Sequence, residues 1–189
     1  MAWNNAGGLV VAGRGQVLSA AVGTALPTSP TAVLNAAFVG VGFHTDDGVS
    51  TNYQPEFEEI MGWQSAYPLR RFRTGEAFEL TFSLLQWDEN STPLAFGGGV
   101  ISTITGGYKY TPPGADDAIV EKSLVCDVQD GVDVIRFVVP RGTTTENVES
   151  QFKRSSAAEL PVTFKSLEAP DGGPSWYFLT SSADYAAGS

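Results

Sequence analysis

The chain has few of the side chains on which enzyme chemistry depends. Its 189 residues include one histidine, His44, and one cysteine, Cys126. A lone cysteine cannot form an internal disulfide, and its apolar neighbours favour a buried thiol. A Ser-His-Asp or Cys-His system would need His44, yet no Gly-x-Ser-x-Gly motif is present and Cys126 falls in a different expected strand. The sequence therefore predicts a protein that is not an enzyme.

Positive charge is also scarce. Charged residues make up 17% of the chain and the formal net charge is −10. This balance disfavours tight binding to nucleic acid or anionic lipid, because such binding draws most of its affinity from Lys and Arg. The main basic cluster is Arg70, Arg71 and Arg73. We interpret it either as solvated surface or as a contact between copies of the chain, in which the arginines would face the acidic segment 46–59.

Signals for a membrane span, a metal site or a cofactor are lacking as well. No apolar run approaches the length of about 18 residues that a spanning helix needs, and no secretion signal is recognisable. We therefore expect synthesis in the cytoplasm and no membrane insertion. The acidic residues between 46 and 59 lack the spacing of a calcium loop. No glycine group is followed by Gly-Lys-Ser/Thr, so no phosphate-binding loop is expected.

What the sequence does contain is alternation of apolar and polar residues with a period of two, which predicts a mainly β fold. We treat residues 1–189 as one domain. The expected strands are 9–18, 38–45, 49–53, a long sheet region over 55–87, then 100–104, 107–111, 118–128, 132–139, 145–154, 159–168 and 176–179. Turns are expected at 46–48, 74–75 and 130–131. A helical turn is expected at 31–37, and a short helix from Asn90 that ends at 97–99.

Large aromatic residues cluster between the expected core strands. Tyr53, Phe57, Trp63, Tyr67 and Trp87 lie in a region rich in Pro and Gly breaks. Each could belong to the core. Together they fit the apolar anchors of a subunit contact, since aromatic residues are enriched at interfaces.

Short motifs in a fixed order are similar to those of a known family. They are Gly-Thr-Ala-Leu-Pro-Thr (23–28), Phe-Val-Gly-Val-Gly-Phe with Asp-Asp-Gly-Val (38–49), Trp-Gln-Ser-Ala-Tyr-Pro-Leu-Arg-Arg (63–71), Leu-Ala-Phe-Gly-Gly-Gly (94–99), Tyr-Thr-Pro-Pro (110–113), Val-Val-Pro-Arg-Gly (138–142), Ala-Ala-Glu-Leu-Pro-Val-Thr-Phe (157–164) and Trp-Tyr-Phe-Leu-Thr (176–180). The chain resembles the major tail proteins, or tail tube proteins, of siphophages that infect actinobacteria.

This resemblance implies a β-sandwich or partial barrel with one short helix. It implies hexameric rings that stack into the virion's tail tube, with inner strands of six subunits completing a barrel through which DNA is ejected. The expected partners are further copies of the chain, the tail terminator, tape-measure and distal tail proteins, and DNA that passes without specific binding. Segment 44–73 is the candidate for a loop and flanking strands that reach the next ring, and residues 1–8 are expected to be a flexible arm.

Two sets of residues follow as hypotheses. The first is a subunit interface made of Asp46, Asp47, Tyr53, Phe57, Glu58, Glu59, Trp63, Tyr67, Arg70, Arg71 and Arg73. The second is a set of carboxylates that line the channel, namely Glu76, Glu79, Asp127 and Asp133. An alternative function is a β-sandwich module that binds carbohydrate or a receptor, with the aromatic residues as its ligand platform.

Overall fold

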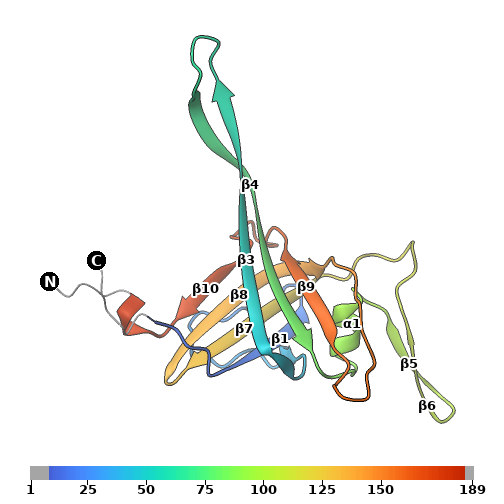
Figure 1. The fold of residues 1–189 in the computed structure, drawn as a ribbon. Helices are drawn as coiled ribbons and strands as arrows, with labels where there is room; N and C mark the ends of the chain where they lie inside the picture. Colours follow the sequence, from blue (N-terminus) through green and yellow to red (C-terminus); the bar gives the residue numbers. More distant parts are fainter. Residues whose placement is uncertain (1–8, 186–189) are drawn as a thin grey trace.

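A computed structural model describes residues 9–185 and confirms a mainly β fold with antiparallel strands (Figure 1). The predicted flexible arm at residues 1–8 lies outside the described residues. The elements are β1 (Arg14–Ala21), β2 (Val39–Gly40), β3 (His44–Met61), β4 (Pro68–Leu84), α1 (Ser91–Ala95), β5 (Val100–Ile104), β6 (Gly107–Thr111), β7 (Lys122–Asp130), β8 (Asp133–Thr144), β9 (Leu160–Ser166), β10 (Tyr177–Thr180) and a short 3₁₀ helix (Ala183–Tyr185).

The main sheet has eight strands and branches at β8. Its order is β2-β1-β7-β8-β9-β4-β3, and β10 pairs with the first half of β8. β9 pairs with the last residues of the same strand, Gly142–Thr144. The branch lets β1, β7 and β8 pack against β4 and β9, so that the apolar faces of the two parts meet in one core. The largest fully buried side chains there include Phe78, Leu80, Leu84, Leu124, Leu160 and Phe164.

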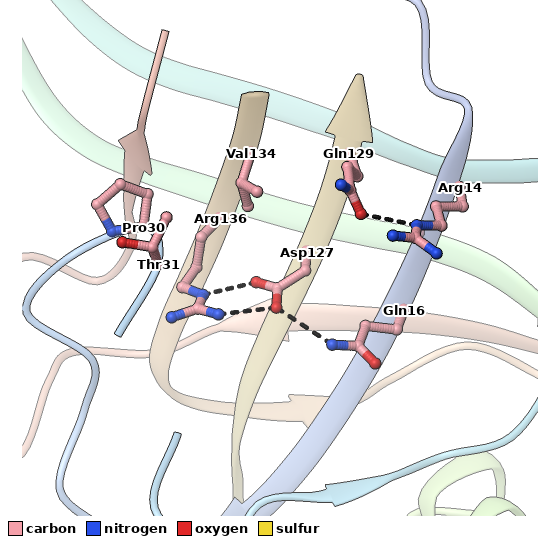
Figure 2. Close-up of a pocket in the computed structure, with 9 residues that line it drawn as sticks. Arg14, Gln16, Pro30, Thr31, Asp127, Gln129, Val134 and Arg136 are labelled. Atoms are coloured by element: carbon pink, nitrogen blue, oxygen red, sulfur yellow. Dashed lines mark hydrogen bonds and ion pairs between the residues drawn. The ribbon is translucent and has the colours of Figure 1, made fainter. Parts of the chain in front are cut away.

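A loop over residues 22–38 covers the opposite face of β7 and β8. Phe38 lies in a smaller apolar cluster with Val125 and Val138. Close by, the buried Arg136 side chain makes an ion pair with Asp127, its cross-strand partner, and donates to the backbone oxygens of Ser29 and Ala32. Figure 2 shows this pair beside Pro30 and Thr31 of the loop. Arg136 therefore fastens the loop to the sheet.

Two of the predicted turns are wrong. Residues 46–48 and 74–75 lie inside the continuous strands β3 and β4, which form one long hairpin whose turn falls at residues 62–67. Gly48 has the positive φ (+73°) that its Asp-Asp-Gly sequence favours, but it lies in an irregularity between His44 and Val49, where the pairing register shifts. Thr74 is the extra residue of a β-bulge, because Glu56 pairs with Gly75 and Phe57 with Arg73.

Of four further local predictions, two are confirmed and two are wrong. The helix predicted after Asn90 is α1, and the Asp130-Gly131 turn joins β7 to β8 as predicted. Residues 145–154 were predicted to be a strand, but they form a loop with one isolated bridge, between Lys153 and Ser156. Segment 31–37 contains turns rather than a helix. β5 and β6 form a separate two-stranded hairpin beside α1 (Figure 1).

Candidate subunit interface

The β3–β4 hairpin projects far from the body of the molecule (Figure 1). β4 pairs with β9 only over Glu79–Leu84, whereas it pairs with β3 over almost its whole length. We call residues 55–76 the arm. Among the described residues, no third strand supports it. An isolated two-stranded ribbon is marginally stable in water, so the arm has the character of an element that is completed by a partner.

The tip of the arm carries large apolar side chains that are exposed to solvent. Trp63 is 99% exposed, and Tyr67 and Leu69 are exposed beside it. Ser65 shapes the turn, because its hydroxyl donates to the backbone oxygen of Tyr67 and accepts from that residue's N–H. Exposure of so much apolar area at one projecting point is typical of a protein–protein contact.

One face of the β3–β4 ribbon carries aromatic rings under an arginine, at the base of the arm. The Arg73 guanidinium carbon lies 6.0 Å from the ring centroids of both Tyr53 and Phe57, and Arg73 also pairs with Glu76 at 3.2 Å. The Tyr53 hydroxyl donates to Glu76 at 3.0 Å. Desolvation and this hydrogen bond raise the pKa of Tyr53, so it stays a neutral donor at pH 7. The structure thus brings together three predicted interface residues.

The other charges of the arm are divided between its faces. Arg71 pairs with Glu59 directly across the hairpin, its Nε lying 2.8 Å from Oε1. This pairing within one copy satisfies the charge of Arg71, which the sequence hypothesis had assigned to another copy. On the opposite face Glu58 lies across from Phe72, and Arg70 makes no ion pair with any described residue. Arg70 is therefore the basic group of the arm that is free to meet a second chain.

Asp46 and Asp47 lie at the other end of the same ribbon. They are exposed within the irregular start of β3, next to the body. The acidic segment 46–59 is therefore not one patch: its first two carboxylates lie at the base, and Glu58 and Glu59 lie on the arm. That any of these residues contacts another copy stays a prediction.

The body carries a second group of exposed aromatic side chains close to that base. Trp87 lies 5.3 Å from Phe152 and 6.4 Å from Phe96, between ring centroids. Its indole N–H donates to the backbone oxygen of Ala158 at 3.4 Å, which ties the segment after β4 to the loop before β9. We call Trp87, Phe96 and Phe152 the base patch. The sequence singled out Trp87 alone, because its neighbours come from distant segments that alternation does not connect.

The four predicted channel carboxylates have partners within the chain. Glu79 pairs with Lys165 at 2.9 Å, and Asp127 forms the buried pair with Arg136. Glu76 is shared between Tyr53 and Arg73, and Asp133 accepts from Ser181 at 3.3 Å. Whether any of them lines a channel stays a prediction.

The lone thiol of the chain is buried and its lone imidazole is partly buried. Burial raises the pKa of the Cys126 thiol to about 12, which leaves it a protonated, inert group at neutral pH. Desolvation lowers the pKa of His44, whose ring packs edge-on against Phe82 at 5.5 Å. Residues 9–185 contain no group of three or more His, Cys, Asp or Glu side chains suited to hold a metal ion.

No helix within the described part of the chain is long and apolar enough to cross a membrane. None of the curated proteins matches the sequence. A family model described as phage tail tube protein matches residues 1–188, which is almost the entire chain. The chain therefore belongs to the phage tail tube protein family, a structural component of the virion that associates with itself into a tube.

Proposed function

We propose that this protein assembles into hexameric rings that stack into the tail tube of a siphophage, and that the tube conducts DNA into the host. The observation that carries the proposal is the arm, a two-stranded ribbon with a fully exposed apolar tip and no third strand among the described residues. The motifs of the chain resemble those of tail proteins from phages that infect actinobacteria, and this resemblance supports an actinobacterial host.

The edges of the main sheet support lateral assembly. β2 pairs with only Leu18 and Ser19 of β1, so Arg14–Gln16 have no described strand on that side. β3 forms the opposite edge of the sheet. Exposed edges carry unpaired N–H and C=O groups, and closing a ring by pairing one copy's edge with the next would satisfy them. Unpaired edges of this kind favour a closed ring over an isolated subunit.

The arm supports axial assembly. It extends beyond the body, so its tip can reach a copy that its own sheet does not touch (Figure 1). The net charge of −10 suits a conduit, because acidic walls repel DNA phosphates and let the genome slide. Tail terminator, tape-measure and distal tail proteins are the further partners that this role requires.

Electron microscopy of the purified protein at rising concentration tests the proposal. We expect hexameric rings and then tubes from the native chain. The matched variant replaces residues 56–75 with Asn-Gly, a sequence that closes a two-residue hairpin between the cross-strand pair Pro55 and Glu76. Its circular dichroism and unfolding should show an intact body, and it should form rings without tubes.

A native chain that stays monomeric at every concentration would contradict the proposal. Retention of that monomer on a glycan column would support the alternative of a carbohydrate-binding module, with the exposed aromatic residues as its platform. Tubes formed equally well by the arm-deleted variant would leave the tail role in place but remove the arm from axial assembly.

A further inference from the structure

We propose that the arm tip of one copy docks on the base patch of a second copy. The inference rests on the proposed function and adds the receiving surface, formed by Trp87, Phe96 and Phe152. Three observations carry it: the two surfaces lie at opposite ends of one ribbon, both are apolar and exposed, and the arm carries an arginine without an ion-pair partner while acidic residues predominate in two of the segments that form the base patch.

The placement of the two surfaces favours a head-to-tail contact. β4 starts beside the tip and ends at Leu84, three residues before Trp87. In Figure 1 the hairpin turn and the end of β4 beside α1 stand at opposite ends of the molecule. An 18-residue strand such as β3 spans roughly 55 Å, so the tip cannot fold back onto its own patch. A contact between opposite ends repeats from copy to copy and produces an open stack.

The two surfaces are chemically alike. The tip offers Trp63 and its exposed apolar neighbours, and the base patch offers Phe152, which is 77% exposed, beside Trp87 and Phe96. A surface hollow of about 470 Å³ adjoins Phe96 and residues 144–148. Projecting aromatic side chains that enter hollows beside other aromatics are the usual anchors of a protein contact.

One unpaired arginine on the arm is complementary to the acidic excess near the base patch. At the arm, Glu59 neutralises Arg71 and Glu76 neutralises Arg73, which leaves Arg70 as the arginine without an ion-pair partner among the described residues. The two segments that carry Trp87 and Phe152, residues 85–90 and 146–159, together contain five acidic residues and two basic ones. Asp46 and Asp47 lie at the same end of the ribbon as the base patch. Arg70, which has no ion-pair partner among the described residues, would approach carboxylates in this arrangement.

Cysteine cross-linking tests the contact directly. Gln64 and Gln151 are exposed residues next to Trp63 and Phe152. A mixture of Gln64→Cys and Gln151→Cys proteins, assembled and then oxidised, should give a disulfide-linked dimer, and the double variant should give a ladder of multimers. The matched control pairs Gln64→Cys with Val132→Cys, at the exposed β7–β8 turn, and should give no such dimer. The native Cys126 is buried and should not interfere.

The outcomes separate this inference from the proposed function. Cross-linked dimers that appear only with the Gln151 partner support the docking. Tubes in the microscope without that cross-link, together with effects of Trp63→Ala and Phe152→Ala that simply add, overturn the docking and leave the tail tube role intact. A chain that forms neither rings nor tubes overturns the proposed function, and the docking with it.

A second measurement covers the chance that cysteines fail to meet in a bonding geometry. Trp63→Ala and Phe152→Ala should each raise the concentration needed for tube formation by about tenfold or more. The double variant should be no worse than the more damaging single variant, because both remove one shared contact. Val33→Ala, which truncates an exposed apolar residue on the 22–38 loop, should leave that concentration unchanged. Effects of Trp63→Ala and Phe152→Ala that simply add would contradict the docking.

Discussion

Replacing Arg136 with Met should be among the most damaging single changes that the body can undergo. The Arg136 and Asp127 side chains are only 7% and 13% exposed. Arg136 donates to the two carboxylate oxygens of Asp127 at 2.6 and 2.9 Å and to the backbone oxygens of Ser29 and Ala32 at 3.2 and 2.8 Å. The variant keeps most of the side-chain volume but leaves a buried carboxylate and two carbonyl groups without these donors.

The expected cost follows from these contacts. Removing one partner of a buried ion pair typically costs about 3–5 kcal/mol, and each carbonyl that loses its donor adds about 1 kcal/mol. Two features reduce the sum. The amide of Gln16 still donates to Asp127 at 3.3 Å, and a hollow of about 520 Å³ beside the pair admits water to the carboxylate. We therefore expect the free energy of unfolding to fall by about 3 kcal/mol.

Urea unfolding of the arm-deleted protein at a concentration below that of ring formation, followed by tryptophan fluorescence, measures this loss without a contribution from assembly. With a slope of about 2 kcal/mol per molar urea, the midpoint should fall by roughly 1.5 M. Arg141→Met is the matched control. Arg141 also lies on β8 and pairs bidentately with Glu121, but these side chains are 37% and 33% exposed, so its loss should cost less than about 1 kcal/mol. Equal losses for the two variants would refute the reasoning.

Two further predictions concern the body. Gly142→Ala should lower the free energy of unfolding of the body by about 1–3 kcal/mol in the same urea assay. A Cβ at this buried position would lie 2.5 Å from the ring of Phe164. Gly107→Ala is the control and should be tolerated, because a Cβ there meets nothing within 4 Å. Desolvation lowers the folded-state pKa of His44, so the unfolded chain binds this proton more readily and stability should fall as the pH drops through about 6.5. His44→Phe preserves the edge contact with Phe82 and should lessen the dependence of stability on pH between pH 7 and pH 5.5. An unchanged pH dependence would contradict a desolvated, neutral His44 in the folded protein.

The sequence predicts local structure well where one short segment is sufficient. The alternation of Phe78, Leu80, Phe82 and Leu84 gives the most buried part of β4, and the Gly97–Gly99 run ends α1. Hairpin position was predicted less well, because a glycine with positive φ is compatible with a turn and with a bulge alike. Only the partner strand decides between them. Gly48 has the backbone angle that a turn would require, yet the chain continues beyond it into the arm.

The candidate interface could likewise be predicted from the sequence only in part. The sequence could nominate Trp63, Tyr67 and the arginines, because they lie together in one segment. It could not show that Arg71 is paired across its own hairpin with Glu59, since that contact depends on the register of β3 against β4. Nor could it assemble the base patch, whose members come from the segments before α1, after α1 and before β9.

The register shifts in the arm bear on how a tube would respond to force. The ladder between β3 and β4 is interrupted between Glu56 and Phe57 and again between Ile60 and Met61, where the ribbon has only two strands. The body, by contrast, is an eight-stranded sheet folded around a dense core. In a tube whose copies are joined through such arms, bending stiffness would be lowest at these interruptions. The tube could then follow a curved path by small rotations at many joints, while each body keeps its shape.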